Sequence, residues 1–94
     1  MNELGDYLRY LRKGKLNLTL KKLSELLFIS DEYVRLIEKE KKKMPEDYPY
    51  RLKKLFPDRI NEKDLEIIEN YYIEERINYL KNKLIEQKQV VLGE

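Results

Sequence analysis

The sequence predicts an all-α protein in which four short helices precede one long helix. Apolar residues recur at helical spacing along most of the chain, and residues that favour helix starts stand before several of these stretches. Only three Gly and three Pro interrupt them. Because 94 residues suffice for one small core with an appendage, we expect a helical head over residues 1–57 and a helical tail over residues 58–94.

The first expected helix covers about residues 2–13. Its apolar positions repeat with the period of one helix face, at Leu4, Leu8 and Leu11. Gly14 or Asn17 can end it, because both residue types tolerate left-handed backbone geometry.

Two short helices are expected next, each with its own N-cap. Thr19 caps a helix over residues 20–27, and Ser30 caps another that frays in the stretch 39–43. Each cap follows an apolar residue that can pack back onto the new helix, Leu18 onto Leu23 and Ile29 onto Val34. The expected inward-facing residues are Leu23, Leu26, Leu27, Val34 and Ile37. The two helices are therefore joined by a short turn.

A short fourth helix is expected with Pro49 in its first turn, and Pro57 ends it. Its apolar residues are Tyr50, Leu52, Leu55 and Phe56.

The tail is expected to be one helix that starts after the N-cap Asn61 and runs to about Lys88. Its apolar stripe consists of Leu65, Ile68, Tyr72, Ile73, Ile77, Leu80 and Leu84. The last four have heptad spacing, and so small a head cannot cover the whole stripe, so we expect these seven residues to pair two copies in a homodimer. The alternative is that the helix folds back on its own head. The tyrosines Tyr71, Tyr72 and Tyr79 are expected in that interface or in the core.

The composition excludes several classes of function. There is no Cys and no His, which excludes disulfides and catalysis by either residue. No metal-ligand spacing or Gly-rich phosphate loop stands out, so we expect no cofactor, no metal and no enzyme activity. No apolar run has the length of a membrane span and no signal peptide is evident, so we expect a protein that acts in the cytoplasm without a membrane.

Charge is unevenly divided between head and tail. Residues 1–57 contain 14 Lys and Arg against 9 Asp and Glu, whereas residues 58–94 contain 6 against 9. A basic half joined to an acidic half suggests that the head faces a polyanion.

The second and third expected helices have the layout of a helix-turn-helix unit, which binds double-stranded DNA by placing its second helix in the major groove. At the sequence level the stretch 4–56 resembles the phage Cro and repressor proteins and their Xre-type bacterial relatives. The resemblance lies in LGDYLRYLR and in TLKKLSELLFISDEYVRLIEKEKKKMP, where these positions match the family pattern: Thr19, Leu23, Leu27, Ile29, Ser30, Tyr33, Val34, Ile37, Glu38 and Pro45. It implies a repressor-like transcription regulator.

Some positions depart from that pattern. Phe28 stands where the family usually has Gly, and a positive φ there would strain Phe by about 1 kcal/mol or more. Leu20 replaces a polar residue that the family places near phosphate, and Glu40 replaces a Gly after the third helix. The loop before the second helix is one residue longer than usual.

The base-reading candidates are Arg35, Asp31, Glu32 and Tyr33. Arg is the commonest reader of guanine, whereas carboxylates accept from cytosine but are repelled by phosphate. Each has a structural alternative: Arg35 can pair with Asp31, both acidic residues can serve only the helix start, and Tyr33 can pack in the core. Glu38 is expected to pair with Arg9 or Arg12.

The phosphate-binding candidates are Thr19, Lys21, Lys22, Lys39, Lys41, Lys42 and Lys43. Lysines along the DNA backbone release counterions and make binding salt-dependent. Their alternative is an ordinary solvated charge run.

A second interpretation is a protein–protein interaction module that has the same fold but binds little DNA. Asp31, Glu32 and Leu20 favour it, whereas Arg35 and the lysines favour DNA. An antitoxin, with the head on its operator and the tail on a toxin, is a third. The resemblance also implies an origin in a virus, plasmid or other prokaryotic mobile element.

Overall fold

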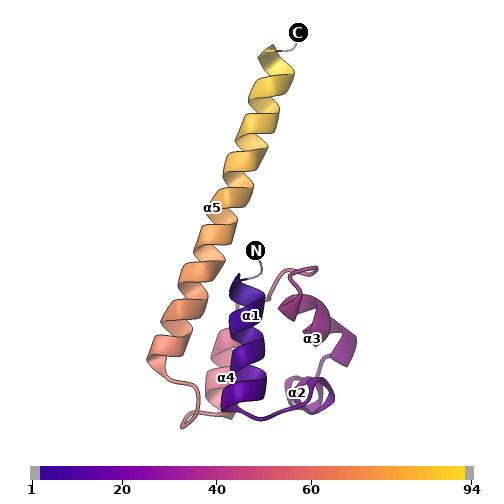
Figure 1. Ribbon diagram of the computed structural model, residues 1–94, viewed down its shortest axis with the longest axis vertical. Coiled ribbons are helices and arrows are strands. Elements are labelled where there is room, and N and C mark those ends of the chain that lie inside the picture. The colour runs from indigo at the N-terminus through magenta and orange to yellow at the C-terminus, as the bar shows by residue number, and fades with distance from the viewer. Residues whose placement is uncertain (1–2, 93–94) are drawn as a thin grey trace.

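A computed structural model of the chain describes the backbone of residues 3–92 and the side chains of residues 3–86. The order of elements is α1 (Glu3–Tyr10), the π-helical turn η1 (Leu11–Lys15), α2 (Leu20–Leu27), α3 (Asp31–Glu38), α4 (Tyr48–Leu55) and α5 (Glu62–Leu92). The predicted all-α class, with four short helices before a long one, is confirmed (Figure 1). No helix of the described chain is both long and apolar enough to span a membrane.

The first predicted helix changes form instead of continuing as an α-helix to residue 13; Asn2 lies outside the described residues. In η1 the Leu16 amide donates to the Leu11 carbonyl over 2.9 Å, which inserts an extra residue into the last turn. As a result Leu11 and Arg12 are both buried. The helix ends at Lys15, and Asn17, two residues later, has φ 53°; Gly14 has no positive φ.

The caps of α2 and α3 are where the sequence predicts them. Thr19 Oγ1 accepts from the Lys22 amide and Ser30 Oγ accepts from the Tyr33 amide, each over 3.0 Å. Each oxygen satisfies an amide that the first helical turn leaves without a partner. Leu23, Leu27, Val34 and Ile37 are buried as predicted, whereas Leu26 is only half-buried.

The predicted helix α4 is present, but only part of its predicted apolar set lies in the core. Tyr48 and Leu52 are buried, whereas Tyr50 is 57% exposed and Leu55 is 40% exposed. The helix starts one residue before Pro49, which places Tyr48 one turn before Leu52 on the inward face.

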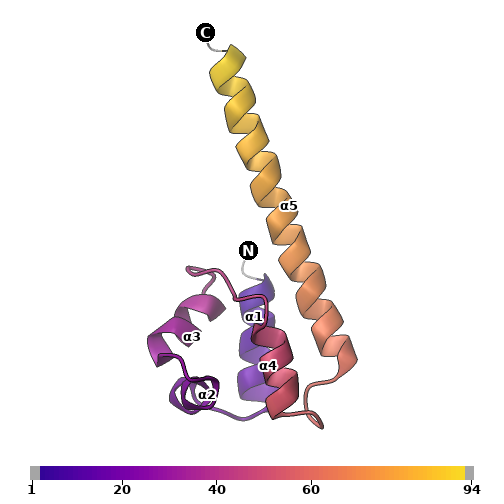
Figure 2. The ribbon, with the colours of Figure 1, turned by 180° about the vertical axis from the view of Figure 1, so that it is seen from behind.

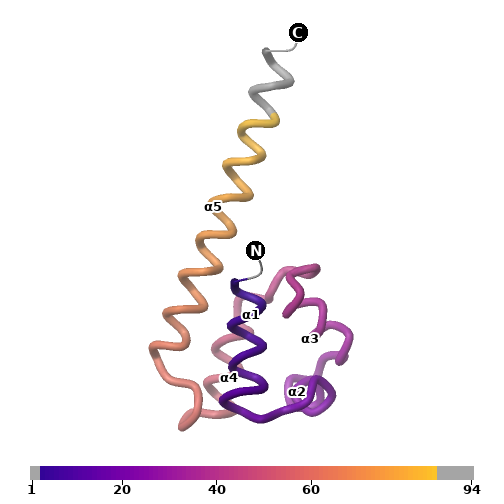
Figure 3. The backbone as a smooth tube through the Cα atoms, in the orientation of Figure 1, coloured from indigo at the N-terminus to yellow at the C-terminus, as the bar shows by residue number. Residues whose placement is uncertain are grey.

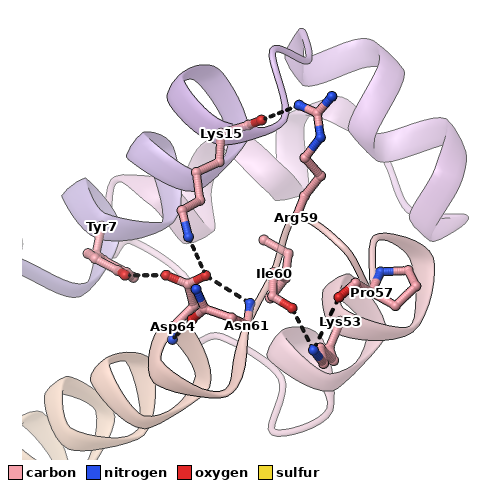
Figure 4. Close-up of polar contacts among 8 residues, drawn as sticks. All are labelled: Tyr7, Lys15, Lys53, Pro57, Arg59, Ile60, Asn61 and Asp64. Atoms are coloured by element: carbon pink, nitrogen blue, oxygen red, sulfur yellow. Dashed lines mark hydrogen bonds and ion pairs between the residues drawn. The ribbon is translucent and has the colours of Figure 1, made fainter.

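The start of α5 is fixed by a buried carboxylate, Asp64 (Figure 4). The Asp64 amide donates to Asn61 Oδ1 and the Asn61 amide donates back to Asp64 Oδ2, over 2.9 and 3.0 Å. Tyr7 Oη and Lys15 Nζ donate to the same carboxylate over 2.6 and 2.7 Å. The predicted cap at Asn61 is therefore confirmed, and it is also the junction that holds α5 against α1 and η1.

Hydrogen bonds keep the Asp64 carboxylate charged. Burial alone would raise the pKa of Asp64, but the bonds from Lys15, Tyr7 and the Asn61 amide outweigh it and the pKa is lowered. Burial, followed by the bond to Asp64, raises the pKa of the Tyr7 hydroxyl. Folding therefore favours the ionised form of Asp64.

Only the first turns of α5 lie against the head (Figures 1 and 2). Ile60 and Ile68 are fully buried, so the core extends beyond the predicted boundary at Pro57. Farther along, the backbone trace in Figure 3 leaves the head and continues alone. The helix continues past the predicted end at Lys88, to Leu92.

Candidate nucleic-acid interface

The turn between α2 and α3 consists of Phe28, Ile29 and Ser30. Phe28 has φ 58° and ψ 40°, and the Ile29 amide donates to the Ser24 carbonyl over 3.1 Å. This bond joins an amide just after α2 to a carbonyl five residues earlier, and it commonly closes a helix that ends in a left-handed residue. Phe28 therefore has the positive φ that strains a residue with a side chain. The ring itself is 91% exposed, so it contributes no core contact in return for the backbone strain.

Close packing of α1 against the end of α3 fixes the orientation of α3. A Cβ added to Gly5 would lie 1.9 Å from the Glu38 carbonyl oxygen, so only Gly permits this approach. The Glu40 carboxylate accepts from the Gly5 amide over 3.1 Å. Glu40 has φ 56°, the left-handed geometry that Gly adopts most readily.

A buried ion pair joins the same two helices. Arg12 Nε and Nη2 donate to Glu38 Oε2 and Oε1 over 2.7 and 3.0 Å. Arg12 Nη1 also donates to the Leu18 carbonyl over 2.9 Å. The fork geometry satisfies both carboxylate oxygens, which a buried ion pair requires. Of the two predicted partners for Glu38, the structure selects Arg12.

The exposed face of α3 carries the predicted base readers. Arg35 Nε donates to Glu32 Oε2 over 2.9 Å and Arg35 Nη2 donates to Glu32 Oε1. The alternative pairing with Asp31 was therefore wrong, because the partner is three residues away and not four. Arg35 lowers the pKa of Glu32, mainly through this hydrogen bond, and the same bond raises the pKa of Arg35. The free protein thus presents a neutralised pair in the middle of the face.

Asp31 and Tyr33 flank this pair. Asp31 is exposed, and its Oδ1 accepts from the Glu32 amide over 2.9 Å, in line with a role at the helix start. Tyr33 is half-buried and packs against the core, so part of its ring remains accessible. Arg35, Glu32 and Asp31 therefore form one surface on α3, with Tyr33 at its inner edge.

The predicted phosphate-binding residues lie near both ends of α3. Thr19, Lys21 and Lys22 are exposed at the start of α2, which lies beside the first turn of α3 (Figures 1 and 2). Lys39 and the stretch 41–43 are exposed in the segment that follows α3. Because Thr19 already caps α2 through its hydroxyl, it offers DNA less than the lysines do.

The lysines after α3 also face α5. The segment 40–44 and α5 line a groove of about 430 Å³, whose lining carries Arg76 and the lysines of the stretch 41–43 together with the carboxylates of Glu40 and Glu75, so that the basic residues outnumber the acidic ones. Lys43 Nζ lies 5.8 Å from the centre of the Tyr72 ring, within the range of a cation–π contact. The basic surface therefore continues from α3 toward α5.

The predicted dimer residues divide into two groups. Ile68 is fully buried and Leu65 and Tyr72 pack against the core, so the alternative that α5 folds onto its own head holds for this part. The assignment of Ile68 to a dimer interface was wrong, because its side chain is inside one copy. Four residues remain exposed: Ile73, Ile77, Leu80 and Leu84 are 46%, 45%, 53% and 53% exposed. We call these four the seam.

Sequence reasoning missed Gly5, Glu40 and Asp64 as the residues that orient α3 and α5. Asp64 had a local signal, because an acidic residue three positions after Asn61 completes a reciprocal capping pair. The other two had none, because their contacts join residues 35 positions apart.

No protein-family model, curated protein or solved structure matches the chain.

Proposed function

We propose that the chain is a sequence-specific, double-stranded DNA-binding transcriptional regulator of repressor type that acts as a homodimer. The observation that carries the proposal is the exposed face of α3, held rigidly by its cap, by Gly5 and by the Arg12–Glu38 pair, with lysines beyond both ends. A major groove accepts one α-helix of this kind, and basic residues on either side are placed to bind its phosphates. Such a role belongs in the cytoplasm, and the small size suits a viral or plasmid regulator.

In this mechanism Arg35 exchanges partners on binding. Free of DNA, its guanidinium is held by Glu32. Guanine offers two acceptors in the major groove that the same fork can bind, whereas Glu32 can accept from a neighbouring cytosine. The intramolecular pair therefore neutralises Arg35 and Glu32 until the bases replace it, and Asp31 leaves one negative charge on the face.

The proposal is tested by selecting duplexes from a random pool and measuring fluorescence anisotropy with the selected duplex and with a scrambled one, at low and near-physiological salt. Arg35→Ala is expected to remove the preference for the selected duplex, which corresponds to about 1–3 kcal/mol of discrimination. Lys22→Ala is expected to weaken both duplexes equally and to reduce the salt slope by about one. Lys54→Ala, on the exposed part of α4, is the matched control.

Two results would contradict the proposal: no duplex is enriched, or the Arg35→Ala variant retains the full preference. Weak binding of both duplexes at low salt alone would mean that the lysines attract any polyanion.

The second candidate function is a protein-binding module, favoured by one observation: the carboxylates of Asp31 and Glu32 lie on the very face that would meet DNA. Glu32→Gln separates the two. It removes a charge that phosphate repels and frees Arg35, so it strengthens DNA binding. It weakens the binding of a basic protein partner to the same face.

A further inference from the structure

The seam on α5 has a distinctive pattern of flanking charges. In heptad terms Ile73 and Leu80 occupy d positions, and Ile77 and Leu84 occupy a positions. The flanking e positions are Glu74 and Lys81, and the flanking g positions are Glu69, Arg76 and Lys83. Such flanking residues set the orientation of two paired helices.

A parallel pair would place like charges together. In a parallel coiled coil a g residue meets the e residue of the next heptad in the partner helix. Glu69 would then face the partner's Glu74, and Arg76 would face the partner's Lys81. Symmetry repeats each contact, so every one of these contacts is repulsive.

An antiparallel pair places opposite charges together at the e positions. Glu74 then meets the partner's Lys81, and this contact also occurs twice. No ion pair within the described chain occupies either side chain. We propose that two copies of α5 pair antiparallel, with Ile73 opposite the partner's Leu84 and Ile77 opposite the partner's Leu80. The inference rests on the homodimer of the proposed function and adds its orientation and register.

The other antiparallel contact, Arg76 with the partner's Lys83, is between like charges and also occurs twice, but the structure weakens it. Lys83 Nζ lies 3.9 Å from Glu86 Oε2 and 5.8 Å from the centre of the Tyr79 ring. Its charge is therefore partly compensated within its own helix.

A groove beside the seam fits the same orientation. Between α5 and the segment 44–50 lies a groove of about 300 Å³, whose lining includes Tyr50, Leu65 and Ile73. Ile73 belongs to both the groove and the seam, so the two surfaces are continuous. In the antiparallel register the partner's α5 beyond Leu84 runs along residues 65–73, which is the α5 side of this groove. A parallel partner would bring its own head against the same place.

The register also sets the distance between the heads. Ile68, where α5 is embedded in the core, is about 10 residues from the middle of the seam. At 1.5 Å per residue the two copies of Ile68 are therefore about 32 Å apart along the helix axis. The half-sites of a dimeric helix-turn-helix protein are about 34 Å apart, one turn of DNA. Antiparallel pairing therefore separates the heads by a length that suits adjacent major grooves.

Charge reversal tests the orientation, because the two orientations predict opposite signs. Sedimentation of the full chain without DNA gives the dimer Kd. In the antiparallel pair Lys81→Glu creates two Glu–Glu contacts and is expected to raise the Kd about fivefold or more. Glu74→Lys acts likewise, and the double variant restores the starting Kd. Lys54→Glu, the same charge change on α4, is the control.

Three outcomes would overturn the proposal: Lys81→Glu tightens the dimer, as a parallel pair requires; neither reversal changes the Kd; or the chain stays monomeric at high concentration. A monomer would also remove the dimer from the proposed function, whereas DNA binding by α3 is measured separately through Arg35→Ala.

Cross-linking gives an independent readout, because the chain contains no Cys. An equal mixture of Ile73→Cys and Leu84→Cys is expected to form disulfide-linked heterodimers on oxidation. Leu84→Cys alone is expected to cross-link poorly, since the two positions 84 are about 16 Å apart along the axis in the antiparallel register. Efficient cross-linking of Leu84→Cys alone would reverse the assignment.

Discussion

The two halves of α5 contain similar apolar residues in different surroundings. Ile68 is fully buried by the head, whereas Ile77, on the same helix, is 45% exposed. One helix pattern thus serves the core of a single copy and then a surface that a single copy leaves open. Hydrophobic spacing alone does not distinguish the two uses, because both follow the same helical period.

The largest expected effect comes from breaking the polar core of the head. Glu38→Ala leaves Arg12 buried without a counter-ion and should lower the free energy of unfolding by about 3–5 kcal/mol. Glu25→Ala, an exposed carboxylate on α2, should change it little. Urea unfolding followed by circular dichroism measures both. Equal stabilities would mean that the Arg12–Glu38 pair is not buried in solution.

A matched pair of truncations compares the two halves of α5 directly. Ile68→Ala should cost about 2–5 kcal/mol at every protein concentration, because it leaves a cavity in the core. Ile77→Ala should barely affect the unfolding of dilute protein and should instead raise the dimer Kd. Thermal unfolding at two widely separated protein concentrations and sedimentation measure both effects. If the loss of stability in Ile68→Ala depends on protein concentration, then Ile68 lies in an interface between copies and not in the core.

The junction between α5 and the head should be sensitive to acid. Because the pKa of Asp64 is lowered on folding, its contribution is complete above the ordinary Asp pKa of about 4 and is lost as the pH falls through the lower folded value. Asp64→Asn should cost about 1–3 kcal/mol at neutral pH and flatten this part of the stability–pH profile. An unchanged acid limb in the variant would assign the acid sensitivity to other carboxylates.

The smallest expected effect is a gain. Phe28→Gly relieves the left-handed backbone and, since the ring is 91% exposed, loses little burial, so stability should rise by about 1 kcal/mol. Phe28→Ala keeps the strain and should change little. If Ala stabilises the protein as much as Gly does, then the backbone geometry of the turn is not the cause.

The fold could be predicted wherever the signal was local. Thr19, Ser30 and Asn61 cap their helices as expected, because a cap depends on amides two or three residues away. The π-helical turn and the approach at Gly5 could not be predicted, because both result from contacts with distant segments.

The candidate site was predicted less completely than the fold. The lysines are exposed as expected and Arg35 is partly exposed, but sequence spacing does not decide which carboxylate an arginine selects. Nor does the spacing show that the apolar stripe on α5 is covered by the head up to Tyr72 and exposed beyond it. That boundary depends on where the segment 44–50 packs beside the helix.

The Asp64 carboxylate at the start of α5 also determines how accurately the distant part of that helix is positioned. The middle of the seam is about 15 residues from Asp64, or about 22 Å along the helix, so a tilt of about 10° at that carboxylate would shift the seam by about 4 Å. That is nearly the width of a side chain. The hydrogen bonds from Tyr7 and Lys15 therefore govern alignment at a surface that neither residue touches.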